Sequence, residues 1–260
     1  MTYRKHGSAP YTIVVVHGGP GAAGSVKSLC ETLGKTHGLL EPFQTEKTIP
    51  SQIEELRRIM DAHACMPVIL IGHSWGAMLG FMFAATHPAL VKKLILVSSG
   101  MLEDVHQDDL REQRESKLSP EEASELSRMR AQFANPKKED MDDVFRRFGR
   151  LMDKIDSYRP IDMPIDDAHY CYEVFASIWP EASAMRKRGE MLSMGAKITC
   201  DVVAIHGDQD PHPGHAVKAS LDKVISNPRF YSLKDCGHMP WKERDAMDTF
   251  YAILTSELLD

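Results

Sequence analysis

A glycine-bracketed turn between an apolar strand and an apolar helix constrains this chain most. Residues 68–71 read as a buried strand, and residues 75–87 as a helix that is apolar on nearly every side until Pro88 ends it. Between them lies Gly72-His73-Ser74-Trp75-Gly76, the pattern G-x-S-x-G. Between strand and helix, this pattern holds its serine in a strained backbone, and the flanking glycines relieve the crowding. Ser74 is therefore a predicted nucleophile, the alternative being an ordinary glycine-rich turn.

Short apolar runs alternate with amphipathic stretches over most of the chain. The run from Tyr11 to Val16 is β-branched and almost wholly apolar, which predicts a strand internal to a sheet. Ser51, with Glu54 as the partner of a capping box, is expected to open the helix before the turn. Further predicted elements are strands at 94–97, 202–205 and 230–233 and a closing helix at 243–259. This alternation predicts a parallel α/β sheet.

The segment from about residue 103 to 195 breaks the alternation, because its patterns predict helices alone. Ser119 and Glu122 form a capping box, and Asn135-Pro136 stops that helix. Such an insert emerges at the carboxyl ends of the strands, where active sites of open α/β sheets lie, so we expect a lid over the site. A stabilising bundle away from the site is the alternative. The expected domains are a core of residues 1–100 and 200–260 and a helical lid of residues 101–199.

A serine hydroxyl needs a base within hydrogen-bond reach, and the base needs an orienting group. His238 follows the last predicted strand in the run Cys236-Gly237-His238, which places it at the same sheet edge as Ser74. The strand 202–205 leads into a loop with Asp208 and Asp210, and either aspartate can serve as the acid. The resulting chain order is Ser, Asp, His.

A glycine-rich loop, His17-Gly18-Gly19-Pro20-Gly21, follows the first strand. It lacks the spacing and lysine of a phosphate-binding loop. Together with Gly72-His73-Ser74-Trp75-Gly76, the loop at 207–210 and Cys236-Gly237-His238, it resembles the α/β-hydrolase superfamily. Within that superfamily the chain is most similar to the proline-iminopeptidase-like group, whose members carry HGGPG and a G-x-S-W-G turn.

The resemblance implies an α/β-hydrolase core with a mostly parallel sheet and a serine-hydrolase mechanism without a cofactor. It favours Asp210 over Asp208 as the acid and places the oxyanion donors at the backbone N–H groups of Gly19 and Trp75. His17, Gly18, Gly72 and Gly76 support these groups. The implied substrates are small esters and short peptides or amides. A carbon–carbon bond hydrolase, or a receptor that keeps the fold with little turnover, remains an alternative.

The chain also departs from the resembled pattern. Ten residues before Tyr11 leave almost no room for the usual N-terminal hairpin, and residues 35–46 are short for a strand-and-loop unit, so we expect a trimmed sheet. Peptidases of the group hold the substrate amine with lid carboxylates, but no local pattern singles out Glu173 or Glu181 for this role. The lid's aromatic residues either line a pocket or pack a helical core: Tyr158, Tyr170, Tyr172, Phe175 and Trp179.

Composition limits the partners and the compartment. A formal charge of −6 without a Lys/Arg block argues against nucleic-acid and anionic-membrane partners, so a small-molecule substrate is expected, with self-association possible at the sheet edge. The chain contains no apolar run of about 18 residues and no secretory signal, which predicts a cytoplasmic protein. Its five scattered cysteines suit reduced thiols.

One cluster also suggests metal ligands: His206, Asp208, Asp210, His212 and His215. A loop that aims a catalytic aspartate explains the same residues, so no metal is expected.

Overall fold

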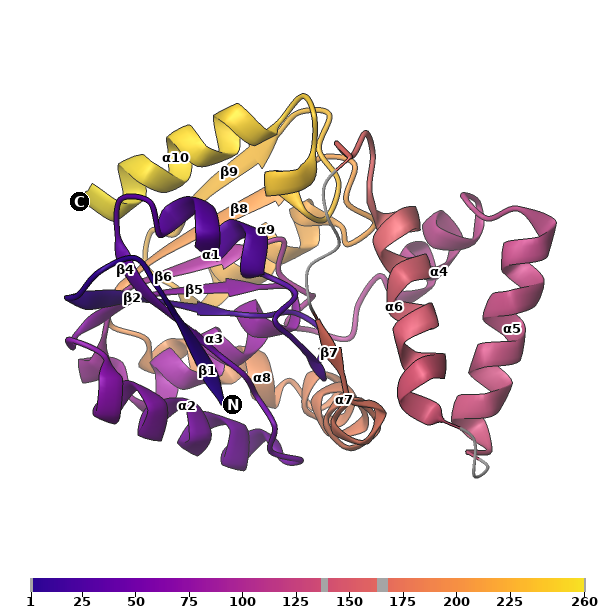
Figure 1. Ribbon diagram of the computed structural model, residues 1–260, viewed down its shortest axis with the longest axis horizontal. Helices are drawn as coiled ribbons and strands as arrows, with labels where there is room; N and C mark the ends of the chain where they lie inside the picture. The colour runs from indigo at the N-terminus through magenta and orange to yellow at the C-terminus, as the bar shows by residue number, and fades with distance from the viewer. Residues whose placement is uncertain (1, 137–139, 163–167, 260) are drawn as a thin grey trace.

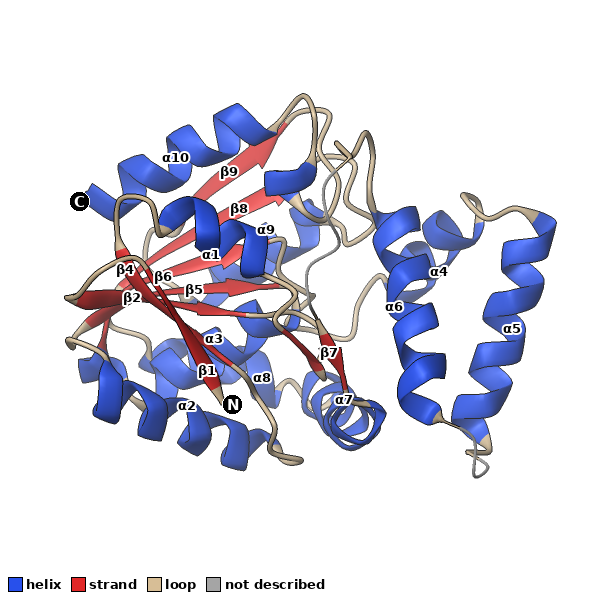
Figure 2. Cartoon of the chain, in the orientation of Figure 1, coloured by secondary structure: helices blue, strands red, loops and turns tan. Residues whose placement is uncertain are grey.

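The computed structural model describes residues 2–136, 140–162 and 168–259. A seven-stranded sheet forms its centre, in the order β1-β4-β2-β5-β6-β8-β9 (Figures 1 and 2). Only β1 runs antiparallel to its neighbour, β4. The strands are β1 (Tyr3–His6), β2 (Tyr11–Val16), β4 (Gly38–Pro42), β5 (Val68–His73), β6 (Val91–Val97), β8 (Asp201–Gly207) and β9 (Arg229–Leu233). The predicted α/β fold with a mostly parallel sheet is confirmed.

Helices cover both faces of this sheet (Figure 1). On one face, α1 (Lys27–Leu33) and α10 (Met247–Leu259) pack in one apolar cluster with Ile13 and Val15 of β2. On the other, α2 (Ile49–His63), α3 (Trp75–Thr86) and α9 (Gly214–Val224) pack with Val14 and Val16. The alternating side chains of β2 are thus buried on both sides, as predicted for an internal strand.

The two segments predicted to be too short for full sheet elements, residues 1–10 and 35–46, each contain a strand. β4 is buried throughout and lies between β1 and β2, although its sequence, Gly-Leu-Leu-Glu-Pro, has little β propensity. Ahead of β2, residues 3–6 form β1, which pairs antiparallel with β4. Tertiary pairing, rather than local preference, therefore decides the structure of these residues.

The predicted start of the helix before the turn is wrong. α2 begins at Ile49, and its N-cap is Thr48, whose side-chain oxygen accepts a hydrogen bond from the Ser51 N–H at 3.2 Å. Glu54 pairs with Arg57 on the exposed face instead of completing a capping box. A proline fits the first helical turn, where no N–H partner is needed, so the helix extends to include Pro50.

Three helices after β6 project to one side of the sheet (Figure 1): α4 (Gln107–Glu115), α5 (Pro120–Ala134) and α6 (Met141–Asp156). We call them the helical lobe. They have a small apolar cluster of their own, which includes Leu126, Val144 and Leu151. The capping box of Ser119 and Glu122 is confirmed at the start of α5.

The rest of the insert packs back onto the body of the protein. α7 (Tyr172–Lys187) buries Val174, Ile178 and Ala182 in the same cluster as α3, and α8 (Glu190–Ser193) and a 3-10 turn (Met194–Lys197) lead into β8. The insert is not helical alone, because β7 (His169–Tyr170) pairs with β3 (Ala22–Ala23). No helix in the described ranges is long and apolar enough to span a bilayer.

A buried carboxylate fastens the chain where it leaves the lobe. The Glu243 side chain, which is fully buried, accepts hydrogen bonds from the backbone N–H groups of Tyr158 and Arg159 at 2.8 and 2.7 Å. It lies just after the 3-10 turn Pro240–Lys242. The lobe therefore ends against the loop that carries His238.

Candidate active site

The turn between β5 and α3 holds Ser74 in a strained conformation. Its φ is 55° and its ψ is −114°, outside the regions that L-residues usually occupy. A Cβ on Gly72 would lie 2.2 Å from the Gly76 carbonyl oxygen, and one on Gly76 would lie 2.3 Å from the Val16 carbonyl oxygen. Any side chain at either position would collide with backbone. This crowding is the physical reason for glycine on each side of Ser74.

The loop after β2 lies directly over Ser74. A Cβ on Gly18 would be 3.3 Å from the Ser74 Cβ, and Gly19 has a φ of +118°. His17 fixes this loop, because its Nδ1–H donates to the Gly18 carbonyl at 2.7 Å and its Nε2 accepts from the Gln44 N–H at 3.2 Å. Burial lowers the pKa of His17, which keeps the neutral tautomer that this arrangement needs.

The structure brings Asp210 and His238 together at the carboxyl ends of β8 and β9. The His238 Nδ1 lies 2.7 Å from Asp210 Oδ2, and both side chains are buried. Burial lowers the pKa of His238, but the charge of Asp210 and the hydrogen bond to it outweigh burial and raise the pKa above its ordinary value. Burial would raise the pKa of Asp210, yet interactions with His238 and His212 hold it well below its usual range.

Two further histidines support this pair. His212 donates through both its backbone N–H and its ring Nδ1 to Asp210 Oδ1, each at 2.9 Å, and its ring stacks on His238. Burial lowers the pKa of His212 to about 4, so it is neutral at physiological pH. The His73 Nε2–H donates to the His238 carbonyl at 2.9 Å. His73 thus points toward the His238 loop. Sequence patterns assign no role to His73 and offer His212 only as a metal ligand.

Asp208 does not join this group. Its Oδ1 accepts the Cys236 N–H at 3.3 Å, whereas Asp210 contacts the His238 ring. His215 likewise faces away and packs its ring against His106. Of the five residues suggested as metal ligands, only His206, Asp210 and His212 lie together. The two histidines contact the Asp210 carboxylate and hold its orientation.

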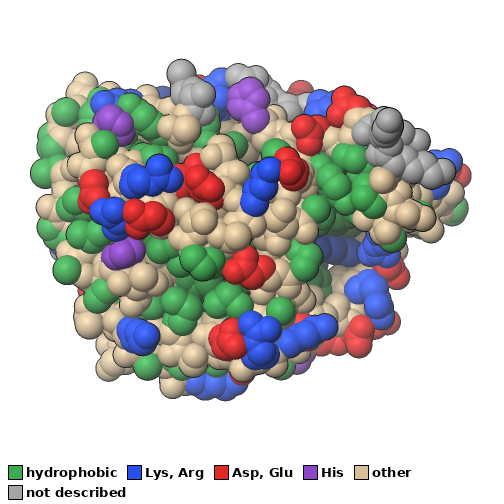
Figure 3. Space-filling model, turned by 90° about the horizontal axis from the view of Figure 1, so that it is seen from below, with side chains coloured by type: hydrophobic (Ala, Val, Ile, Leu, Met, Phe, Trp, Pro, Cys, Tyr) green, Lys and Arg blue, Asp and Glu red, His purple; other side chains and the backbone are tan. Residues whose placement is uncertain are grey.

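A cavity of about 250 Å³ opens over Ser74. Ser74, His238, Gly19 and Trp75 form its sheet side. Residues of the lobe and of α7 line the opposite side. Seen from below in Figure 3, the surface is hollowed where the body meets the lobe, and Lys and Arg side chains stand at that hollow.

The aromatic residues of the insert divide between the two expected roles. Tyr170, Phe175 and Trp179 line the cavity. Tyr172 stacks on Phe133 within the insert, and Tyr158 is largely solvent-exposed.

Neither candidate amine-binding glutamate reaches the cavity lining. Glu173 pairs with Lys47, and Glu181 Oε2 accepts the Ile49 N–H at 3.0 Å.

An ion pair that sequence reasoning missed joins two lobe helices at the cavity wall. Arg114 Nε donates to Asp156 Oδ1 at 2.8 Å, and a second guanidinium nitrogen donates to Oδ2. Burial would lower the pKa of Arg114, but Asp156 outweighs it and raises this pKa. The Asp156 carbonyl also accepts the His238 N–H at 2.9 Å, so the end of α6 is tied to the predicted base. No sequence signal pairs residues this far apart.

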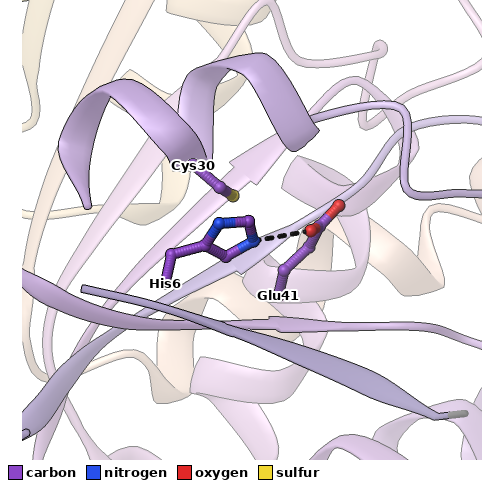
Figure 4. Close-up of side chains that lie close together, drawn as sticks. All are labelled: His6, Cys30 and Glu41. Carbon is purple, nitrogen blue, oxygen red and sulfur yellow. Dashed lines mark hydrogen bonds and ion pairs between the residues drawn. The ribbon is translucent and has the colours of Figure 1, made fainter. Parts of the chain in front are cut away.

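Two groups of described residues bring potential metal-ligating atoms within 4.8 Å of one another. One is Asp156, His212 and His238 of this site. The other joins β1, α1 and β4: His6, Cys30 and Glu41 (Figure 4). His6 Nε2 is 2.9 Å from Glu41 Oε2, and the Arg4 guanidinium is 3.7 Å from the same oxygen. Because a neighbouring guanidinium disfavours a dication, this group fits an ion pair that fastens the sheet edge.

Comparison with known proteins agrees with this fold. A family described as alpha/beta hydrolase fold matches residues 33–245. A cis-3-alkyl-4-alkyloxetan-2-one decarboxylase of Shewanella oneidensis is 26% identical over 102 residues, which cover 34% of this chain and 32% of that protein. The match thus spans about a third of that relative's length.

Two solved structures share the fold over nearly the whole chain. VinJ aligns with a TM-score of 0.72 at 18% identity, covering 98% of this chain and 93% of VinJ. The esterase EaEST from Exiguobacterium antarcticum aligns with a TM-score of 0.71 at 16% identity, covering 99% and 95% of the two chains. At these identities the similarity shows the fold alone.

Proposed function

Since the chain belongs to the alpha/beta hydrolase fold family, we propose that it is a serine hydrolase that forms an acyl-enzyme on Ser74. The observation that carries the proposal is the convergence of a strained Ser74, the buried Asp210–His238 pair and the glycine loop on one cavity. A turn this crowded costs stability, and such strain persists where the surrounding structure over-determines it, often at active sites.

In the proposed mechanism, His238 Nε2 takes the proton of the Ser74 hydroxyl as its oxygen attacks the acyl carbon. Asp210 accepts the Nδ1–H of His238 and stabilises the imidazolium that forms. The imidazolium then gives its proton to the leaving alcohol or amine. Water, activated in turn by His238, releases the acid and restores Ser74. None of these steps requires a cofactor.

The oxyanion is proposed to lie between the N–H groups of Gly19 and Trp75. Trp75 is the first residue of α3, so its N–H has no acceptor within the helix and lies at the positive end of the helix dipole. Gly19 belongs to the loop held over Ser74 by His17. Each preorganised donor of this kind lowers the barrier by about 3 to 4 kcal/mol.

The proposed substrates are small esters and amides, in keeping with the size of the cavity. The HGGPG loop and the G-x-S-W-G turn support a relationship to the proline-iminopeptidase-like group. Neither Glu173 nor Glu181 lines the cavity, so the structure offers no support for amine recognition by either one. We therefore propose esters as better substrates than aminoacyl amides. The insert is proposed to act as the lid.

A fluorophosphonate probe tests the nucleophile. We expect the native protein to be labelled on the peptide containing Ser74, and Ser74→Ala to remain unlabelled. A protein that does not label, or a variant that labels equally, overturns the proposal and favours a ligand receptor. A panel of acyl esters and aminoacyl amides, proline derivatives included, then ranks the substrates. Preference for a free α-amine would support the peptidase assignment.

A further inference from the structure

A buried arginine lines the cavity without a carboxylate partner among the residues that the structure describes. Arg186, near the end of α7, is 5% exposed and lies with its guanidinium 5.1 Å from the centre of the Trp179 ring. Among the described residues, its buried Nε has no hydrogen-bond partner, and no carboxylate oxygen lies within 4.0 Å of its guanidinium. Arg186 therefore brings an unneutralised donor to the cavity wall.

Arg186 differs in this respect from Arg114, a second arginine of the cavity wall. Both guanidinium groups line the same cavity, but Arg114 is neutralised by the two oxygens of Asp156. Burial lowers the pKa of Arg186, and the more distant charge of Asp104 opposes that effect only in part. A buried charge without a partner is costly, so a protein retains one where a ligand supplies the missing charge.

A second unsatisfied donor lines the same cavity. Gln107 is the first residue of α4, and its buried Nε2 has no hydrogen-bond partner in the described part of the chain. An amide N–H₂ and a guanidinium are both donors, and neither can satisfy the other. Two donors from different helices on one cavity wall therefore lack an acceptor, and the positive charge of Arg186 favours an acceptor that is negative.

We propose that Arg186 and Gln107 bind a carboxylate on the substrate, so that the enzyme hydrolyses small esters or amides that also carry a free carboxylate. This inference rests on the proposed function, because Ser74 must act on the same molecule. A single carboxylate fits better than a phosphate dianion, because the Asp153 side chain also lines the cavity and would repel a second negative charge. The guanidinium supplies planar paired donors, which match the two carboxylate oxygens.

A pair of matched esters tests the proposal. p-Nitrophenyl hydrogen glutarate carries a free carboxylate, and methyl p-nitrophenyl glutarate has the same acyl chain without the charge. The measured quantity is the ratio of their kcat/KM values. We expect the native enzyme to prefer the charged ester and Arg186→Met to lower the ratio about tenfold or more, since a hydrogen bond to a charged group is lost.

Control variants separate binding from structure. Arg188→Met removes an arginine two residues away that is half-exposed and paired with Glu190, and it should leave the ratio unchanged. Arg186→Lys keeps the charge and should retain part of the preference. If Arg186→Met does not fold, Gln107→Leu replaces it and should lower the ratio by a smaller factor.

The outcomes are distinguishable. A native enzyme that prefers the neutral ester, or a ratio unaffected by Arg186→Met or by its substitute Gln107→Leu, overturns the carboxylate site. Preference for a third ester with a terminal ammonium group also overturns it and indicates recognition by Asp153. Labelling of Ser74 by an uncharged fluorophosphonate decides the proposed function separately, because that probe does not need the carboxylate site.

Discussion

The two walls of the cavity are built by different means. On the sheet wall, Ser74 and Gly19 are held by backbone conformation, with neighbouring glycines packed against main-chain atoms. On the lobe wall, position depends on side-chain pairs: Arg114 and Asp156 lie 42 residues apart in sequence. We infer that crowded backbone turns fix the position of the proposed catalytic groups, so that substitutions in these turns are not tolerated. Substrate selectivity would instead depend on side-chain contacts of the lobe wall, which single substitutions can alter.

The largest expected effect is on the sheet wall. Asp210→Asn should lower kcat by about 10⁴, because the amide no longer favours the Nδ1–H tautomer or stabilises the imidazolium. Asp208→Asn is the matched control, because Asp208 accepts a hydrogen bond from the Cys236 N–H and forms no hydrogen bond or ion pair with His238 within the described residues. We expect this variant to retain most activity. Steady-state kinetics on one ester compares the two. Equal losses would show that the acid has been misassigned.

A second pair of variants compares the two cavity walls by the free energy of unfolding. Ala at Gly76 would place its Cβ 2.3 and 2.5 Å from two backbone oxygens, whereas the atoms nearest to a Cβ on Gly149 in α6 belong to the Tyr170 side chain, the first at 2.6 Å. We expect Gly76→Ala to cost about 3 kcal/mol or to prevent folding, and Gly149→Ala to change stability by about 1 kcal/mol or less. Urea unfolding measures both, and similar values would mean that the turn is less rigid than proposed.

A third comparison lies within the lobe. Arg114→Met leaves the buried Asp156 carboxylate without its partner and should cost about 3 kcal/mol. Arg130→Met breaks a half-exposed pair with Glu115 and should cost about 1 kcal/mol or less. Hydrogen exchange in α4 and α6 should increase only in the first variant. If both behave alike, the buried pair does not hold the lobe wall.

The smallest effect concerns pH. His238 must be neutral to accept the Ser74 proton, and its pKa is raised above 6.5, so kcat/KM should rise with pH through a midpoint above 6.5. The histidines on either side, His73 and His212, have lowered pKa values and would instead give a midpoint below 6.5. A pH profile on an uncharged ester distinguishes them, and a low midpoint would remove His238 as the base.

The same contrast explains what the sequence predicts. Ser74, His238 and the loop with Asp208 and Asp210 each follow a predicted strand, so local patterns bring them to one edge of the sheet. The family resemblance favours Asp210 within that loop, and the structure places it against His238. Arg186 and Gln107 are singled out because their buried donors lack hydrogen-bond acceptors among the described residues. Whether a donor finds an acceptor depends on packing between helices far apart in the chain, which no local pattern predicts. Sequence patterns do not predict β4 for a related reason, because its burial depends on pairing with β1 and β2 on either side.

The central claim is that Ser74 carries the acyl group during turnover. Mass spectrometry of enzyme quenched in acid while it hydrolyses p-nitrophenyl acetate tests this directly, because the ester bond to serine survives acid. We predict one acetyl group on the peptide containing Ser74, absent from Ser74→Ala and accumulating when His238→Ala slows deacylation more than acylation. Turnover with no acetylated Ser74, or acetylation at another residue that supports the same rate in Ser74→Ala, would contradict the account.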